Sequence, residues 1–367
     1  MGIIQRVACM CAAIVTVMAA LSGCAGQGSR GEVSQDRPIT SPSPAPTPAG
    51  SMSLDCDRLF APAELAGLLG PVHTASGSTS EQGLAALADV DRAAARGPLA
   101  LIAVGGAECV WTHGDSRLTV QVLPHAADSW AGLADAYAHA AAPGAAYAGG
   151  ESRGGDCVVF EGGGMSCHTN VLVGEAWLAV EVSSVSAQGA TEASFHDAVQ
   201  RMLPAVAEAA ASAPAAATGP VPACGADDLR RQQEQAFGRP AITNMGVEET
   251  FRIEAAVLQA GATGLCEFQP SADGSGGWFS DASVLRRASN VFEAHTAAAR
   301  AVDPAATTRT ITVGGRSIPV LLWHRTFDIT PLTTADALID GAWLQYRTVD
   351  PNDDGAVAMM AWLAGRI

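Results

Sequence analysis

Apolar and polar residues alternate with a period of two in several segments of the chain. In residues 118–122 and 178–182, aliphatic side chains are separated by polar or small ones. This alternation is typical of strands with one buried face. Residues 195–206 instead carry apolar side chains at helical spacing, which predicts a helix with one apolar face.

Two further helices are expected in the first half of the chain. One covers Pro62–Leu69, and the other covers Ala126–Ala142 and ends at Pro143-Gly144. The predicted order is therefore helix, two strands, helix, three strands, helix. Strands joined by hairpins, with helices between the runs, predict an antiparallel sheet in an α+β domain.

The second half of the chain repeats this order more loosely. After a helix at Ala226–Ala236 we expect these elements: a strand at Trp278–Val284, a helix at Ala288–Ala301, and strands around Arg309–Val313, Ile318–Phe327 and Trp343–Val349. A closing helix follows the acidic segment 350–355.

Three landmarks recur in both halves, at separations of roughly 160 residues, which is the size of a whole domain. They are a cysteine before the first helix (Cys56, Cys224), a cysteine two residues before an aromatic (Cys109, Cys266), and a Gly-Ala-Trp-Leu-like strand start (Trp177, Trp343). The chain is therefore predicted to hold two tandem homologous domains, residues 53–213 and 223–367, joined by a linker at 214–222.

The N-terminus has the layout of a secretory signal. One cation, Arg6, precedes an apolar run that ends at Leu21 and is too short to span a bilayer. Leu21-Ser22-Gly23-Cys24 resembles the bacterial lipobox, which implies that residues 1–23 are removed and that Cys24 carries lipid. An ordinary signal peptide with a chance cysteine is the alternative. Arg6 stands where an N-myristoylation motif needs Ser or Thr.

Residues 24–52 are rich in Ser, Pro, Thr and Gly, the composition of an extended tether. No later stretch is apolar and long enough to cross a bilayer. We therefore expect a protein anchored by lipid to the outer face of the cell membrane.

Six cysteines remain once the signal and Cys24 are set aside, and an even number in an oxidising compartment favours disulfides. The duplication pairs Cys56 with Cys109 and Cys224 with Cys266, which leaves Cys157 and Cys167 to bond across a hairpin. A zinc site is the alternative, but the chain has no Cys-x-x-Cys and no His-x-x-x-His pair.

The charge balance argues against nucleic acid and anionic lipid head groups as partners of the whole surface. The net charge is −16, and it becomes one unit more negative when Arg6 leaves with the signal. All basic residues are arginine, and Ala and Gly are abundant. This composition indicates a GC-rich genome, such as that of an actinobacterium.

The lipobox, the tether and a domain with Cys56, Cys109 and Trp111 together resemble a set of actinobacterial lipoproteins whose domain has no assigned function. More distantly, the chain is similar to the extracellular sensor domain of a mycobacterial Ser/Thr protein kinase. The resemblance implies a disulfide-bonded helix-and-sheet module that holds a ligand in a cleft. The second copy departs from it, because Phe268 replaces the tryptophan. These motifs are structural and transfer no catalytic residues.

A search for catalytic chemistry finds no complete constellation. Ser275 is flanked by glycines but lacks the strand-to-helix setting of a nucleophile elbow and a histidine at a recognisable spacing. His168, next to Cys167, is interpreted as an ordinary strand histidine. No phosphate-binding or dinucleotide-binding loop is present, and no cofactor is expected.

Two other groups of residues have competing interpretations. Asp350, Asn352 and Asp354 match the opening of a calcium loop, but the twelfth place is Ala361 instead of glutamate. Capping of the following helix explains them without metal. Trp177 and Trp343 are candidate cleft aromatics, although a core position is the favoured interpretation.

The sequence thus favours a non-catalytic ligand-binding or sensor-like lipoprotein of the cell envelope with an unidentified ligand or protein partner. An envelope hydrolase with an unrecognised site and a structural cell-wall spacer are the alternatives.

Overall fold

The structure is a computed structural model that describes residues 52–70, 74–77, 94, 98–160, 164–184, 190–214, 227–238, 242–244, 251–259, 263–269, 280–327 and 330–367. The signal peptide, Cys24, nearly all of the tether, most of the linker, Cys224 and Ser275 lie outside these residues. Their assignments stay predictions. Among the described residues, no helix has both the length and the hydropathy needed to cross a bilayer.

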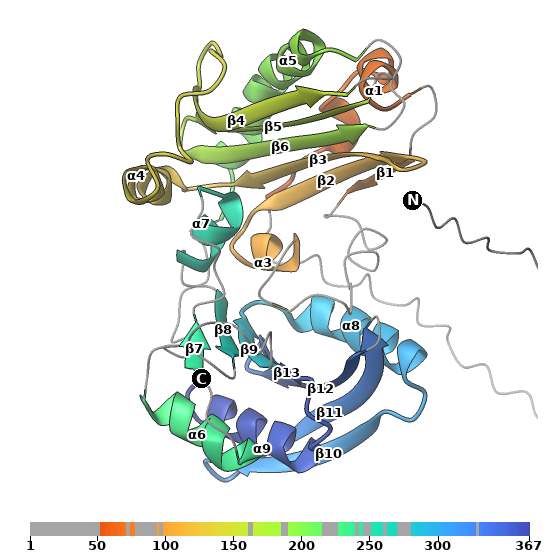
Figure 1. Ribbon diagram of the computed structural model, residues 1–367, viewed down its shortest axis with the longest axis vertical. Coiled ribbons are helices and arrows are strands. Elements are labelled where there is room, and N and C mark those ends of the chain that lie inside the picture. Colours follow the sequence, from red (N-terminus) through yellow and green to blue (C-terminus); the bar gives the residue numbers. More distant parts are fainter. Residues whose placement is uncertain are drawn as a thin grey trace, which may run out of the picture. The chain divides into compact units, whose positions relative to one another are not determined.

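The first half of the chain forms a six-stranded antiparallel sheet with the order β1-β2-β3-β6-β5-β4 (Figure 1). Its strands are β1 (Thr74–Gly77), β2 (Ala107–His113), β3 (Ser116–Leu123), β4 (Glu151–Val159), β5 (Met165–Val173) and β6 (Ala176–Ser184). Its described helices are η1 (Cys56–Arg58), α1 (Pro62–Leu69), α3 (Pro98–Ala103), α4 (Ala127–Ala136) and α5 (Glu192–Ala211).

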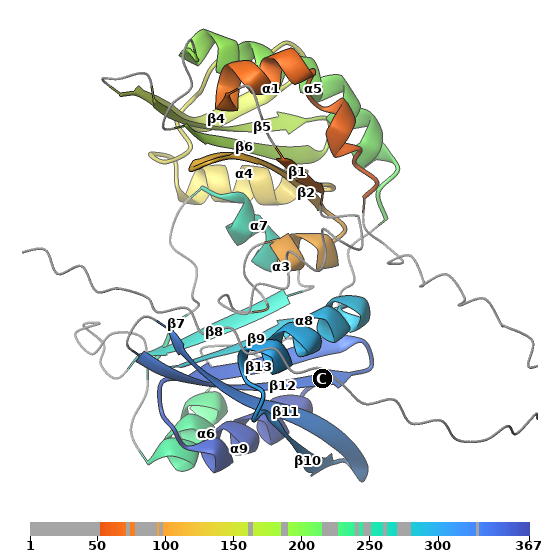
Figure 2. The same cartoon turned by 90° about the vertical axis from the view of Figure 1, so that its right-hand side faces the viewer.

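Helices α1 and α5 cover one face of this sheet (Figure 2). The alternating aliphatic residues of β3 and β6, including Leu118 and Val182, belong to the same buried cluster as Val199 and Val206 of α5. The two-residue period of the strands and the helical period of α5 therefore meet in one core. The helix begins after Thr191, whose hydroxyl accepts a hydrogen bond from the Ser194 amide at 3.1 Å.

The second half forms a seven-stranded antiparallel sheet with the order β10-β11-β12-β13-β9-β8-β7. Its strands are β7 (Ile242–Asn244), β8 (Thr263–Gln269), β9 (Ser280–Leu285), β10 (Thr307–Val313), β11 (Arg316–Phe327), β12 (Thr330–Ile339) and β13 (Ala342–Thr348). Its described helices are α6 (Asp227–Phe237), α7 (Ile253–Gln259), α8 (Ser289–Val302) and α9 (Asp353–Ala364). The α+β class and the two antiparallel sheets with flanking helices are thus as the sequence predicts.

The two sheets share one strand order. Reversed, the second sheet runs β7-β8-β9-β13-β12-β11, which matches β1-β2-β3-β6-β5-β4 strand for strand, with β10 added at the edge. The helices also correspond along the chain: α3 is the element directly before β2, α7 is the element directly before β8, and α5 and α9 each close their half. The internal duplication inferred from three landmarks is therefore visible in the topology.

On the face of the first sheet opposite α1 and α5, a second buried cluster gathers residues from both halves of the chain. It contains residues of α3, α4 and α7 together with Trp177 and Trp343. Phe251, just before α7, stacks on Trp177 with ring centroids 4.7 Å apart and meets Trp130 of α4 edge-on at 4.9 Å. The tryptophans at matching places in the two strands are thus core residues.

Several sequence expectations need correction. The helix expected at Ala126–Ala142 ends at Ala136. The following turn instead contacts a bulge in β4, where the Gly154 amide donates to the Ala142 carbonyl at 2.8 Å. The sequence interpretation also omitted β1, β7, β12, α3 and α7, so each half has more elements than the predicted order.

Two of the three predicted disulfides are confirmed. Cys56 bonds to Cys109 and ties the start of the first module to β2. Cys157 bonds to Cys167 across the β4–β5 hairpin, where the two residues are direct partners in the strand register. Cys266 is also disulfide-bonded. Its predicted partner Cys224 lies outside the described residues.

Candidate functional site

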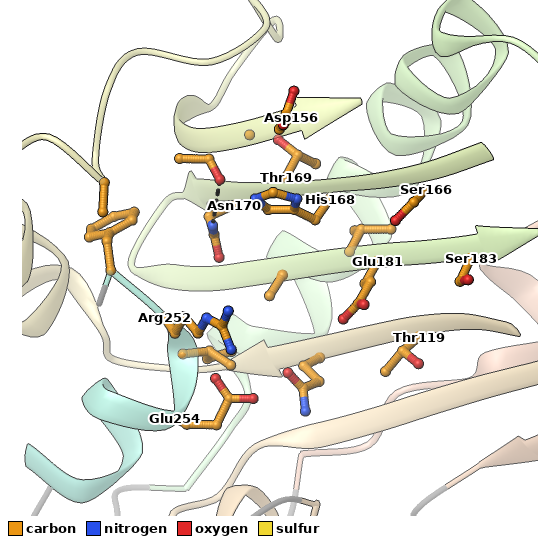
Figure 3. Close-up of a pocket in the computed structure, with 18 of the residues that line it drawn as sticks. Thr119, Asp156, Ser166, His168, Thr169, Asn170, Glu181, Ser183, Arg252 and Glu254 are labelled. Carbon is orange, nitrogen blue, oxygen red and sulfur yellow. Dashed lines mark hydrogen bonds between the residues drawn. The ribbon is translucent and has the colours of Figure 1, made fainter. Parts of the chain in front are cut away.

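A cavity of about 950 Å³ lies on the face of the first sheet that α1 and α5 do not cover (Figure 3). Strands β2 to β6 form its floor, and the starts of α3 and α7 border it together with residues after α4. Cavities of roughly 300–1,000 Å³ are the size that small-molecule sites have.

The floor consists of three rows of side chains, and each row joins direct partners on adjacent strands. The rows lie on one face of the sheet because residues two positions apart along a strand point to the same side. The rows run across β2 or β3 to β5 or β4 as Glu108–Gln121–Ala179–Asn170, as Thr119–Glu181–His168–Asp156, and as Arg117–Ser183–Ser166. All of these residues line the cavity. Figure 3 shows the second row, with Thr119, Glu181, His168 and Asp156 on four different strands.

The lining is hydrophilic and carries both signs of charge. It contains four carboxylates, Glu108, Asp156, Glu181 and Glu254, against the guanidinium groups of Arg117 and Arg252. Between them lie neutral groups that can both donate and accept hydrogen bonds: Thr119, Gln121, Ser166, Asn170 and Ser183.

Glu108 is the most deeply set of the four carboxylates. Its side chain is buried, with 3% of the residue exposed, and its Oε2 accepts a hydrogen bond from Gln121 Nε2 at 2.8 Å. Glu181, in the next row, is exposed. The cavity therefore combines one fixed acidic group at its base with exposed acidic groups that a bound molecule could reach.

Ala179 gives the cavity its depth. It lies in the centre of the first row, between Gln121 and Asn170, and it presents only a methyl group. Asn170 is held in place because its Oδ1 accepts a hydrogen bond from Trp177 Nε1 at 3.0 Å. The hydrogen bond from Trp177 thus fixes the side chain of Asn170, whereas the small side chain of Ala179 leaves space above the sheet.

The corresponding face of the second sheet is buried, and a segment from the first half of the chain lies on it, because the Ala94 amide donates a hydrogen bond to Gln345 Oε1 at 2.9 Å. Gln345 occupies the place of Ala179, between Ser283 and Asp336. In the next row Arg347 occupies the place of Glu181, and it forms a buried ion pair with Asp281 through Nη2 and Oδ2 at 2.6 Å. All five residues are at most 9% exposed.

Asp336, which corresponds to Asn170, is the centre of this polar network. Its carboxylate, fully buried, accepts hydrogen bonds from Trp323 Nε1 and Trp343 Nε1, each at 2.7 Å, and from Gln345 Nε2 at 3.0 Å. His295 Nε2 of α8 lies 3.1 Å from its Oδ2. Four donors around one buried carboxylate satisfy a group that would otherwise be costly to bury.

The network also sets the protonation of Asp336. Burial by itself would raise the pKa of this carboxyl, but the nearby His295 imidazole and the hydrogen bonds from His295, Trp323 and Trp343 outweigh burial and lower the pKa. Asp336 is therefore ionised at neutral pH, whereas its counterpart Asn170 carries no charge.

The structure separates the residues that the sequence singled out. Trp177 and Trp343 are 0% and 1% exposed and do not line the cavity, so the interpretation of these rings as cleft aromatics is wrong. His168 does line the cavity, and it is exposed. Its place on the floor was not expected from the sequence.

The acidic segment before α9 caps that helix. Asn352 Oδ1 accepts from the Gly355 amide at 3.0 Å, Asp350 Oδ1 accepts from the Asn352 amide at 3.1 Å, and Asp354 pairs with Arg309 at 2.6 Å. Because these oxygens serve different partners, the geometry favours capping over the calcium interpretation. Among the described residues, the metal-compatible group of three is Cys157, Glu192 and His196.

The fold and the cavity define the class of the molecule as a duplicated, disulfide-bonded α+β protein with an open polar cavity in the described part of its first sheet. No family model, curated protein or solved structure matches the chain.

Proposed function

We propose that the protein is a lipid-anchored lipoprotein on the outer face of the cell membrane that binds a polar ligand in the cavity of the first sheet, without converting it. The observation that supports this most directly is the difference between the two equivalent faces. In the second, Gln345 and Arg347 are buried and paired, whereas the first has Ala179 and Glu181 at these places and a cavity of about 950 Å³.

The proposed location at the outer face of the membrane follows from the sequence of the N-terminus. Leu21-Ser22-Gly23-Cys24 has the form of a lipobox, and the disulfides at Cys56–Cys109 and Cys157–Cys167 suit an oxidising compartment. Replacing Cys24 by alanine should abolish incorporation of labelled palmitate and release the protein from membranes. Retention of both in the variant would contradict the proposed anchor.

The lining indicates a ligand rich in hydroxyl and amide groups. The neutral side chains of Thr119, Gln121, Ser166 and Ser183 can each donate and accept hydrogen bonds, and carboxylates outnumber guanidinium groups. Fragments of the cell wall, in which acetamido sugars carry short peptides, have this chemistry and occur in the proposed compartment. Such a ligand could explain a sensor-like role.

Calorimetric titration of the full-length protein in detergent with muramyl dipeptide and with an N-acetylglucosamine trimer tests the proposal. Heat of binding is expected for at least one probe with the wild type. Ala179→Gln, which copies the second sheet, should weaken that binding by at least about tenfold, or about 1.4 kcal/mol. Ala305→Gln, at an exposed position before β10, is the matched control and should bind as the wild type does.

The same titration separates the alternatives. Release of a cleaved product during incubation would favour an envelope hydrolase. Absence of binding to both probes, with no partner recovered by crosslinking, would favour a structural spacer.

A further inference from the structure

A second group of chemically active side chains lies away from the cavity, where α5 meets the edge of the first sheet. Cys157 of β4 and Glu192 and His196 of α5 bring one ligand atom each within 4.8 Å of one another. Glu192 and His196 are four residues apart and therefore lie on the same face of the helix. Cys157 is bonded to Cys167 of β5, so a second sulfur adjoins the group.

His196 is oriented as a metal-binding histidine would be. Its Nδ1 lies 2.6 Å from the hydroxyl of Tyr147, and its Nε2 lies 3.6 Å from Glu192 Oε1. The phenol oxygen can accept the Nδ1 proton of the tautomer whose Nε2 lone pair is free. Metal-bound histidines usually donate their second ring N–H to an oxygen acceptor, most often a carboxylate, a backbone carbonyl or a water, and the phenol oxygen of Tyr147 takes that place here.

We infer that reduction of the Cys157–Cys167 disulfide by a dithiol creates a four-coordinate zinc site. Its ligands are the Sγ atoms of Cys157 and Cys167, Nε2 of His196 and Oε1 of Glu192. The dithiol gives two electrons and two protons to the two cysteine sulfurs and becomes a disulfide itself. Zinc then displaces both thiol protons, because the thiolate is the ligand.

The dimensions of the group suit zinc. Bonds of about 2.0–2.3 Å in a tetrahedral site place ligand atoms roughly 3.3–3.8 Å apart. The atoms of Cys157, Glu192 and His196 already lie within 4.8 Å of one another. Cys167 Sγ is not part of this group and is held at Cys157 by the disulfide, so it must rotate toward the other ligands after the disulfide opens. Two thiolates, one imidazole and one carboxylate form a donor set that zinc accepts.

A reductant and a metal ion can reach the side chains of this group from solvent. Cys157 and His196 are half-buried and Glu192 is exposed, whereas Cys167 is fully buried. A reductant therefore reaches the pair through the sulfur of Cys157, and the metal enters from the side of Glu192. The bound ion replaces one link between β4 and β5 and adds a link to α5.

Cobalt titration tests the inference. The full-length protein in detergent is reduced with dithiothreitol, desalted without oxygen and titrated with Co²⁺. We expect one equivalent to give the intense visible bands of tetrahedral cobalt and a near-ultraviolet thiolate charge-transfer band, both removed by Zn²⁺. The oxidised protein should show neither.

Variants identify the ligands. His196→Gln should weaken cobalt binding by more than about tenfold, and Tyr147→Phe by about tenfold with the thiolate band retained. His125→Gln is the matched control, because His125 also faces a carboxylate, Glu175, at 3.6 Å but has no neighbouring disulfide in the described structure. It should bind as the wild type does.

Three results would overturn the site: no thiolate band in the reduced protein, equal binding by the oxidised protein, or unchanged affinity in His196→Gln. The last test does not depend on a cysteine substitution, which could prevent folding. Because other disulfides are also reduced, Cys157→Ser with Cys167→Ser must abolish the thiolate band, whereas Cys56→Ser with Cys109→Ser must retain it.

Discussion

The two sheets have equivalent faces that are used in opposite ways. In the second sheet, Asp336 accepts a hydrogen bond from Gln345, Arg347 pairs with Asp281, and all four residues are buried. In the first sheet, Asn170, Ala179 and Glu181 occupy the same register and leave a cavity. A duplicated fold can therefore keep one copy as a self-satisfied core while the other offers its polar groups to a ligand.

The largest effect should come from the buried carboxylate. Asp336→Asn copies Asn170 of the first sheet, but its amide turns a donor toward the four donors that now surround the carboxylate. We expect a loss of about 3 kcal/mol in the free energy of unfolding, measured by chemical denaturation. Asp340→Asn removes an exposed carboxylate that pairs with Arg316 and should leave the free energy of unfolding almost unchanged, because solvent screens the pair. Equal losses in the two variants would contradict the role assigned to Asp336.

The two tryptophans sharpen the same comparison. Trp343→Phe removes a hydrogen bond to a charged group, whereas Trp177→Phe removes one to a neutral amide. Since both rings are buried, the loss of packing is similar. The hydrogen-bond contribution should be about 2 kcal/mol for Trp343 and about 1 kcal/mol for Trp177. Denaturant midpoints measured at one pH would reveal the order, and a reversed order would break the comparison.

Acid should weaken the second sheet through Asp336. Because the pKa of Asp336 is lowered in the folded state, its contribution to stability is complete above the unfolded value of about 3.9 and is lost as the pH falls through the folded value. The wild type should therefore lose more stability than Asp336→Asn as the pH falls below about 4. Parallel profiles for the two proteins would show that other carboxyl groups govern acid unfolding.

The smallest effect is expected from moving the ion pair of the second sheet to the first. Thr119→Asp with Glu181→Arg copies the Asp281–Arg347 pair at a more exposed place. A double-mutant cycle should give a coupling energy of at most about 1 kcal/mol, because solvent screens the pair. A coupling of several kcal/mol would mean that the first face is as dry as the second.

The sequence predicted those parts of the fold that leave a periodic pattern. Strands β3 and β6 alternate in hydrophobicity, and α5 has one apolar face, so each was found near its observed bounds. Strand β12 was missed because Pro331 and several threonines interrupt its pattern, although most of its residues are buried on both faces. Helices α3 and α7 have only six and seven residues, too few turns to show a helical period, and α3 is apolar throughout.

The cavity was beyond sequence reasoning for a different reason. Thr119, Gln121 and Glu181 were visible as the polar partners in alternating strands, which normally marks a solvated face. Their convergence depends on the order β3-β6-β5-β4 and on the return of α7 from the second half of the chain. Likewise, the zinc search required regular spacing within one segment, whereas Cys157 and His196 come from two elements.

The additional strand β10 has a consequence for self-association. It pairs with β11, whereas in the first sheet the strand equivalent to β11, β4, is the last in its sheet. The first part of β4 is hydrogen-bonded to residues 142–144, but no described strand pairs with the outer edge of its last part, where Val158 and Val159 are exposed. An unpaired edge of this kind can template pairing with another chain. The bulge between Arg153 and Asp156 shifts the register of this edge and bends it. The irregularity in β4 therefore protects the chain against edge-to-edge aggregation, a task that β10 performs in the second sheet by covering β11.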